Sequence, residues 1–184
     1  MLLVRHAESE LHGRFCGSSD PGLSPRGEQE ARQLAEKLAG FPITHIYCSP
    51  LRRVRMTVEA LPQFKSAAVT IVEALREIGF GEWEGLTWKE IEQRDPAFAR
   101  RWMERFPGET PPGGESFAAF QRRVEQAWSA IRAQVTAEAN SMTAIVAHGG
   151  VLQVIQACHS QCKFQDFPML GTAEFVTIKC VVES

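Results

Sequence analysis

Two short apolar runs, far apart in the chain, each end on a histidine. Leu2-Leu3-Val4 leads into Arg5 and His6, and the run from Ala144 to Ala147 leads into His148. Continuous apolar runs of this length are typical of strands that are buried on both faces of a parallel sheet. Ligands gather at the carboxyl ends of such strands. We therefore expect both imidazoles and the Arg5 guanidinium to share one pocket, which suits a phosphate dianion and favours phosphoryl chemistry.

The size and composition of the chain exclude several classes of protein. Its 184 residues predict one domain with a substantial core, and 44% hydrophobic with 23% charged residues is a globular balance. A net charge of -2 without a Lys/Arg block argues against a nucleic-acid partner. The apolar runs are too short to span a bilayer, and Met1 leads directly into a strand pattern without a signal peptide. We therefore expect a cytoplasmic protein that binds neither nucleic acid nor membrane.

The cysteines also favour a cytoplasmic protein. Their number is odd and their spacing matches no disulfide framework, so we expect reduced thiols at Cys16, Cys48, Cys158, Cys162 and Cys180. The segment Cys158-His159-x-x-Cys162 resembles half of a metal site. A structural zinc site normally needs four ligands, and no second half is present, so no metal site is predicted.

Strand-like and helix-like segments alternate along the chain. The strand patterns cover residues 2–4, 43–48, 69–72, 143–147 and 174–182. The helix patterns cover residues 25–38, a segment from Ser49-Pro50 to Leu61, residues 87–105 with an interruption at Asp95-Pro96, residues 117–135 and residues 150–159. This alternation predicts a three-layer α/β/α sandwich around a mainly parallel sheet, with residues 174–182 as an antiparallel edge strand.

Four motifs in a fixed order carry a family resemblance. Arg5-His6-Ala7-Glu8-Ser9 is similar to Arg-His-Gly-Glu-Thr, and Ser49 to Thr57 is similar to Ser-x-Leu-x-Arg-Ala-x-x-Thr. The segments Leu75 to Gly85 and His148-Gly149 follow, with Gly113 to Ser116 between them. Together they resemble the histidine phosphatase superfamily, whose fold is phosphoglycerate-mutase-like. The resemblance covers nearly all of residues 1–184 as a single domain, with residues 78–115 as an insertion or lid over the active site.

The resemblance implies a role for each motif residue. His6 would attack phosphorus to give a phosphohistidine, and Arg5, Arg53 and His148 would neutralise the phosphoryl oxygens. Glu77 would give a proton to the leaving oxygen and then activate water. The implied phosphate contacts are Arg5, His12, Arg53, His148 and Gly149. Neither a metal nor a cofactor is implied, because these cations supply the positive charge.

Some positions depart from the family pattern or leave a choice open. His12 stands where the family usually has asparagine, and its protonation would make phosphate binding depend on pH. Glu82 is a second carboxylate after Glu77, and the residues alone do not choose between the two. The Leu-x-Glu spacing of the family favours Glu77.

The surroundings of the motifs favour a phosphatase, a phosphoric monoester hydrolase, over a mutase. Ile78 and Trp88 stand where mutases carry cations, and the Gly-Glu-Trp-Glu-Gly segment resembles the α-ribazole phosphatase and broad-specificity phosphatase branches. The expected substrate is a small phosphorylated metabolite, such as α-ribazole 5'-phosphate or another nucleoside or sugar phosphate. A phosphoglycerate mutase and a non-catalytic phosphate-binding module remain the alternatives. Several aromatic residues can form either a pocket rim or plain core: Phe15, Phe80, Trp83, Trp88 and Trp102.

Overall fold

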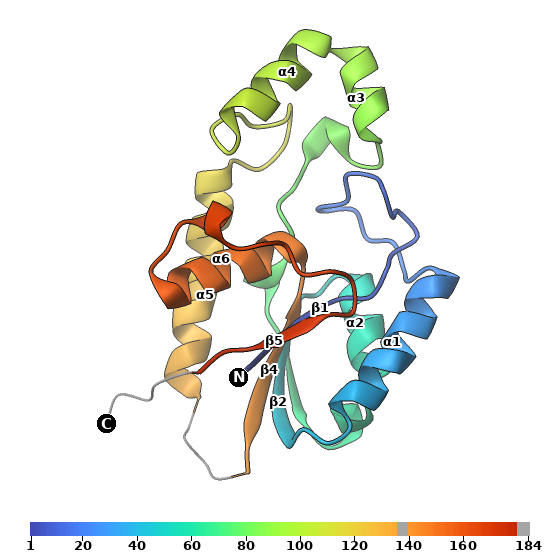
Figure 1. The fold of residues 1–184 in the computed structure, drawn as a ribbon, viewed down its shortest axis with the longest axis vertical. Coiled ribbons are helices and arrows are strands. Elements are labelled where there is room, and N and C mark those ends of the chain that lie inside the picture. Colours follow the sequence, from blue (N-terminus) through green and yellow to red (C-terminus); the bar gives the residue numbers. More distant parts are fainter. Residues whose placement is uncertain (136–139, 180–184) are drawn as a thin grey trace.

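The computed structural model describes residues 1–135 and 140–179 and contains a five-stranded sheet. Its strands run in the order β3-β2-β4-β1-β5 and comprise β1 (Leu2–Arg5), β2 (Ile43–Cys48), β3 (Ala68–Ile71), β4 (Met142–Ala147) and β5 (Phe175–Thr177). Strands β1 to β4 pair in parallel, whereas β5 pairs antiparallel with β1. The predicted mainly parallel sheet with an antiparallel edge strand is therefore confirmed (Figure 1).

Helices cover both faces of this sheet, as predicted for an α/β/α sandwich. One face is covered by α1 (Pro25–Leu38) and α2 (Arg52–Glu59), and the other by α5 (Phe117–Gln134) and α6 (Gly149–Ser160) (Figure 1). Single 3-10 turns occur at η1 (Pro62–Lys65), η2 (Glu73–Leu75), η3 (Gly81–Trp83) and η4 (Phe164–Asp166). The helices that the structure describes include none long and apolar enough to cross a membrane.

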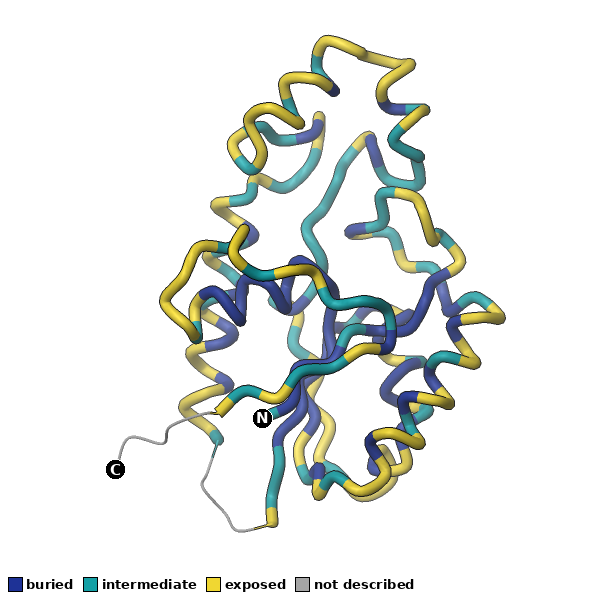
Figure 2. The backbone as a smooth tube through the Cα atoms, viewed as in Figure 1, coloured by how far each residue is buried: buried dark blue, intermediate teal, exposed yellow. Residues whose placement is uncertain are grey.

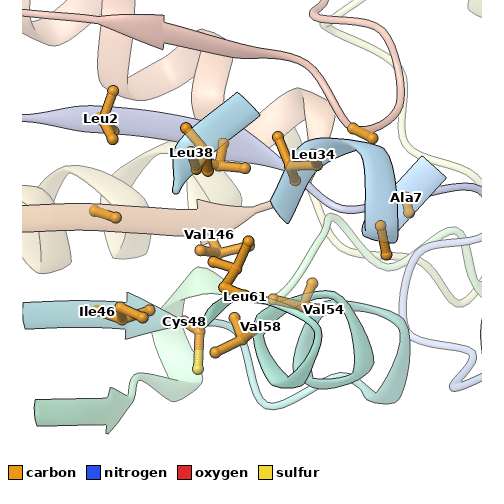
Figure 3. Packing of buried hydrophobic residues seen from close by; sticks show 14 of the residues in the cluster. Leu2, Ala7, Leu34, Leu38, Ile46, Cys48, Val54, Val58, Leu61 and Val146 are labelled. Atoms are coloured by element: carbon orange, nitrogen blue, oxygen red, sulfur yellow. The ribbon is translucent and has the colours of Figure 1, made fainter. Parts of the chain in front are cut away.

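The two faces of the sheet bury separate hydrophobic clusters because successive strand side chains point in opposite directions. Leu2 and Val4 belong to the cluster under α1 and α2, whereas Leu3 between them belongs to the cluster under α5 and α6. Figure 3 shows Leu34 and Leu38 among the side chains packed over the sheet on the first face. In the central strands, the parts that lead to the site are buried, namely Ile46–Cys48 of β2 and Thr143–Ala147 of β4 (Figure 2), so the strand ends at the site are held by tight packing.

A separate layer lies beyond the carboxyl ends of the strands. It holds α3 (Trp88–Arg94) and α4 (Pro96–Arg105), drawn at the top of Figure 1, around a small cluster with Trp83 at its centre. The predicted interruption at Asp95-Pro96 is confirmed. The Asp95 side chain accepts a hydrogen bond from the N–H of Phe98 at 2.9 Å and so begins α4.

Two predicted boundaries are wrong. The helix expected from Ser49-Pro50 begins at Arg52, because Leu51 is still extended and takes the N-cap position, while the Ser49 hydroxyl accepts from the N–H of Leu51 and from no N–H inside the helix. The edge strand expected over residues 174–182 extends only from Phe175 to Thr177, since its partner β1 is itself short. Residues 180–182 of that prediction lie outside the described residues.

The loop after β1 packs directly on the first turn of α1. A Cβ built on Gly27 would lie 1.9 Å from the carbonyl oxygen of Glu8, far inside van der Waals contact. Only glycine fits this position without moving the loop that follows His6.

We predict that Gly27→Ala lowers the free energy of unfolding by about 1–3 kcal/mol, the usual cost of overpacking. Gly40→Ala is the matched control, because a Cβ there meets nothing within 4 Å, and it should change stability by less than about 1 kcal/mol. Urea unfolding of both variants measures the difference. Equal stability of the two variants would contradict the packing argument.

Candidate active site

The carboxyl ends of two neighbouring strands bring both predicted histidines together. Arg5 of β1 stands opposite Ala147 of β4, and the N–H of His6 donates to the carbonyl of Ala147 at 3.0 Å. The rings of His6 and His148 lie edge to face, with centroids 5.0 Å apart. The shared position predicted for the two histidines is therefore confirmed.

The His6 ring is held in one tautomer. Its Nδ1 lies 2.7 Å from the carbonyl oxygen of Ala7. A carbonyl oxygen only accepts, so Nδ1 carries the hydrogen and Nε2 keeps a free lone pair. Burial, followed by the positive charge of Arg53, lowers the pKa of His6 to about 3. The ring is therefore neutral and nucleophilic at physiological pH.

His148 presents its other ring nitrogen to the site. Its Nε2 lies 2.8 Å from the hydroxyl of Ser49, which also accepts a hydrogen bond from the N–H of Leu51 at 3.3 Å. Among the described atoms, its buried Nδ1 has no hydrogen-bond partner. Burial, followed by the neighbouring His6, lowers the pKa of His148 well below its ordinary value. An unpaired buried nitrogen is costly unless a ligand supplies its partner.

Arg53 is buried, with 1% of its surface exposed, on the first turn of α2. Its two terminal nitrogens donate to the carbonyls of Ser19 at 2.8 Å, Gly17 at 3.0 Å and Cys16 at 3.3 Å. No carboxylate in the described part of the chain lies within ion-pair distance of it. The guanidinium therefore carries its charge beside the two histidines without a direct ion pair, and Glu77, Asp20 and Glu84 act on it only from a longer distance.

Arg5 is the last residue of β1 and directly precedes His6. One of its terminal nitrogens donates to the carbonyl of Leu170, and its buried Nε has no partner among the described atoms. A Cβ added to Gly149 would lie 3.4 Å from the Arg5 guanidinium carbon and 2.6 Å from the sulfur of Met169. The predicted residues Arg5 and Gly149 are therefore neighbours.

Glu77 comes from the segment after β3 and is close enough to Arg5 and Arg53 to act on the charge of both. Its carboxyl oxygens accept hydrogen bonds from the N–H groups of Ile78 and Gly150, each at 3.0 Å. Burial raises the pKa of Glu77 although these hydrogen bonds oppose it. Glu82, by contrast, is exposed. This geometry supports Glu77 over Glu82 as the residue that carries a proton.

His12 lies away from this group. Its side chain is 65% exposed, and its Nδ1 is 3.6 Å from a carboxylate oxygen of Glu8. None of the hydrogen bonds and ion pairs described for His12 involves the other predicted site residues. A contact between His12 and phosphate stays a prediction.

Glu84 organises the loop that holds Arg53, a role that sequence reasoning missed. Its carboxylate accepts hydrogen bonds from the backbone N–H groups of Gly17, Ser18, Ser19 and Phe80, between 2.8 and 3.2 Å. Burial alone would raise the pKa of Glu84, but these bonds outweigh it and the pKa is lowered. The only sequence feature that could have pointed to this role is the position of Glu84 in the Gly-Glu-Trp-Glu-Gly motif.

Arg123 holds the backbone that carries Glu77. Its guanidinium donates to the carbonyls of Ala74, Arg76 and Glu77, and forks onto both oxygens of Glu115 at 2.7 Å. The sequence contains no signal for this role, because an arginine inside a long amphipathic helix is usually a solvated surface residue.

A cavity of about 510 Å³ opens beside Glu77. All five aromatic residues belong to or pack against the hydrophobic cluster under α3 and α4. Phe15, Phe80 and Trp102 also line the cavity, whereas Trp83 and Trp88 do not. The aromatic residues thus divide between the two predicted roles. Elsewhere, Cys158 and Cys162 are exposed. Across residues 1–135 and 140–179, no group of three or more His, Cys, Asp and Glu side chains is arranged to hold a metal ion.

Known proteins resemble this chain in both sequence and fold. The family described as the histidine phosphatase superfamily (branch 1) matches residues 1–180. Phosphoserine phosphatase 1 of Hydrogenobacter thermophilus is 38% identical over 127 residues, which are 68% of this chain and 60% of that protein's length. The adenosylcobalamin/α-ribazole phosphatase of Salmonella typhimurium is 31% identical over 85% of this chain and 77% of its own length.

A solved structure extends the similarity to the fold. The α-ribazole phosphatase of Shigella flexneri superimposes with a TM-score of 0.83 at 25% identity, covering 95% of this chain and 87% of that one. The α/β/α arrangement and its edge strand are therefore shared with a solved phosphatase structure.

The burial of His6 predicts a specific loss of stability in acid. Unfolded histidine binds a proton below its ordinary pKa of 6.5, whereas folded His6 stays neutral down to about 3. The unfolded state thus binds more protons in this window, so the contribution of His6 is complete above pH 6.5 and is lost as the pH falls. Between pH 7.5 and 5.0, we expect His6→Asn to lose about 2 kcal/mol less stability than the wild type. Urea unfolding at both pH values measures this, and identical losses would mean that His6 is not buried in its neutral form.

Proposed function

The chain belongs to branch 1 of the histidine phosphatase superfamily, and from that premise we propose that it hydrolyses small phosphomonoesters through a phosphohistidine on His6. One observation carries this proposal. The neutral His6 ring keeps its Nε2 lone pair free while buried positive charge surrounds it. This is the arrangement required by a nucleophile that attacks a phosphate dianion.

The first step transfers the phosphoryl group to the enzyme. His6 Nε2 forms a bond to phosphorus as the bond from phosphorus to the leaving oxygen breaks. Arg5, Arg53 and the Nδ1 of His148 bind the non-bridging oxygens and stabilise their charge. Arginine suits this task because its fork binds two phosphate oxygens at once. Gly149 and His12 are the further proposed phosphate contacts.

Glu77 moves the protons in both steps. Burial raises the pKa of Glu77 and so favours the protonated carboxyl group, whose proton passes to the leaving alkoxide. In the second step, water attacks phosphorus and the bond to His6 breaks. The Glu77 carboxylate takes the proton of that water. Inorganic phosphate leaves, and both residues return to their initial states.

We further propose that residues 78–115 form the lid over this site, as part of a single domain that spans residues 1–184. The walls of the 510 Å³ cavity support this role, since Phe80, Trp102 and Phe106 come from that segment. The cavity begins at Glu77, on the side where the alcohol of the substrate would leave. The lid segment would therefore contact the alcohol, while the sheet contacts the phosphate.

The proposed substrate is α-ribazole 5'-phosphate or another nucleoside or sugar phosphate. The Salmonella and Shigella proteins named for α-ribazole support this class. A mutase is less well supported, since Ile78 lines the cavity and Trp88 packs in the cluster under the lid helices, where mutases would need cations. A non-catalytic module is also less well supported, because all five expected catalytic groups are present.

Removing the nucleophile and removing the acid should have different effects. His6→Ala should abolish hydrolysis of every substrate. Glu77→Gln should reduce the turnover of an alkyl phosphate by about 10²–10⁴-fold, because its alkoxide needs a proton. Nitrophenyl phosphate, whose anion leaves unaided, should be affected far less where phosphorylation limits the rate. Steady-state rates on both esters measure the contrast, and acid-labile phosphohistidine should accumulate where dephosphorylation limits instead.

Glu82→Gln is the matched control, because it removes an exposed carboxylate from the same segment. It should leave both rates within about twofold of the wild type, as expected for a surface change. A selective loss on alkyl phosphates in Glu82→Gln would assign the proton to Glu82. Equal losses on both esters in Glu77→Gln, without a trapped intermediate, would also contradict our assignment.

The protein's own cations supply the charge in this mechanism, so activity should not depend on divalent metal. We expect full hydrolysis of nitrophenyl phosphate in excess EDTA and strong inhibition by vanadate, an oxyanion that can take the place of phosphate. Loss of activity on chelation, restored by adding back a divalent ion, would refute the metal-free route.

A further inference from the structure

We infer that the cavity beside Glu77 selects phosphomonoesters whose alcohol carries an uncharged aromatic ring, and that it rejects alcohols with a carboxylate. This inference rests on the proposed phosphatase function and narrows its substrate class. The cavity would thus favour nucleoside phosphates with an aromatic base over plain sugar phosphates. It would favour both of these over phosphoserine and phosphoglycerates, which carry a carboxylate.

The cavity is placed to receive the alcohol and not the phosphate. Among the predicted catalytic residues, only Glu77 lines it. Gly150, which donates its N–H to Glu77, lines the same wall. The proton donor therefore stands at the boundary between the cationic group and the cavity. A phosphoryl group at His6 would direct its leaving oxygen past Glu77 into this space.

The walls of the cavity are mainly aromatic. Rings line it from the loop after β1, the lid segment, α5 and the segment after α6, namely Phe15, Phe80, Trp102, Phe106, Phe117 and Phe164. Its volume of about 510 Å³ lies within the range usual for sites that bind small molecules. Stacked and edge-to-face contacts with such rings favour a flat, apolar group.

The same walls offer no positive charge. Among the described residues that line the cavity, none is a lysine, arginine or histidine. The three acidic residues that line it already have partners. Glu77 accepts two backbone hydrogen bonds, Arg123 forks onto Glu115, and Arg105 contacts Glu109 at 3.2 Å. A substrate carboxylate placed here would lose its water without gaining a cation, which is strongly unfavourable.

Sugar hydroxyls would meet mainly aromatic and apolar side chains, because Gln153 and Gln165 are the only uncharged polar side chains among the described residues that line the cavity. The Gln153 amide already donates to the carbonyl of Phe167 at 2.7 Å. A polar substrate group that enters an apolar site and stays unpaired loses affinity. The base of a nucleoside would fill the aromatic space, whereas the sugar alone would leave it filled with water.

The test compares esters of matched chemistry on the full chain. α-Ribazole 5'-phosphate and AMP carry an uncharged ring, ribose 5-phosphate lacks the ring, and 3-phosphoglycerate and phosphoserine carry a carboxylate. We expect kcat/KM for at least one ring-bearing ester to exceed that for ribose 5-phosphate by about 10–100-fold. The carboxylate esters should be poorer than ribose 5-phosphate by at least about tenfold.

Two variants locate the selectivity in this cavity. Phe106→Ala removes a ring from the wall and should lower kcat/KM for the ring-bearing esters by about tenfold, with little change for ribose 5-phosphate. Gln165→Arg places a cation on an exposed part of the lining and should raise activity on 3-phosphoglycerate by about tenfold. Gln93→Arg is the control for added charge, because Gln93 is exposed on α3 and does not line the cavity. It should change neither kcat/KM for the ring-bearing esters nor activity on 3-phosphoglycerate.

Binding separates failure of this inference from failure of the proposed function. Calorimetry with His6→Ala, which cannot turn substrate over, should give the tightest Kd for a ring-bearing ester. If no ester is hydrolysed by the wild type but this binding order holds, the phosphatase proposal fails and the specificity inference stands. If nitrophenyl phosphate is hydrolysed but phosphoserine or 3-phosphoglycerate is bound and cleaved best, the inference is overturned and the phosphatase stands.

Discussion

The site depends on a guanidinium that is buried without a carboxylate partner in the described part of the chain. Taking a charge out of water is expensive unless polar groups replace the lost hydration. For Arg53, three backbone carbonyls from the loop after β1 replace it. Because carbonyl dipoles carry no net charge, the positive charge of Arg53 is retained for a ligand. The same charge, added to burial, keeps His6 neutral.

The contacts that hold Arg53 link residues 78–115, the proposed lid, to the proposed phosphate end of the site. Glu84 lies in that segment, and its carboxylate binds the N–H groups of the loop whose carbonyls hold Arg53. On the opposite side, Arg123 of α5 binds the backbone that carries Glu77. Arg53 and Glu77, the proposed proton carrier, are thus positioned by residues outside the set of proposed phosphate contacts. Such supporting contacts maintain the precise geometry that phosphoryl transfer requires.

The two ends of the proposed substrate would meet opposite environments. The phosphate end contains two arginines and two histidines, whereas the described residues that line the cavity beyond Glu77 contain no cation. A phosphate dianion would be stabilised at the first end and excluded from the second. In the proposed mechanism this division orients a phosphomonoester, because only its uncharged part would fit the aromatic side. Glu77 lies where the two environments meet, and burial there raises its pKa.

The sequence by itself determined the alternation of strands and helices, the strand ends at His6 and His148, and the order of the motifs. These are local signals, because apolar periodicity and the residues that follow a strand are written in short segments. It did not determine that Ser49 binds His148 or that α2 begins at Arg52, nor which aromatic rings line the cavity. In the sequence, Phe15 and Trp83 are both simply aromatic residues near a motif. In the fold, Phe15 lines the cavity and Trp83 is buried in a hydrophobic cluster. Glu84 and Arg123 act on segments distant in the chain, so their roles come from contacts that only the tertiary structure creates. Burial lowers the pKa of His6 and raises that of Glu77, and only the folded chain decides both shifts, because a pKa depends on the solvent and charges that surround a group.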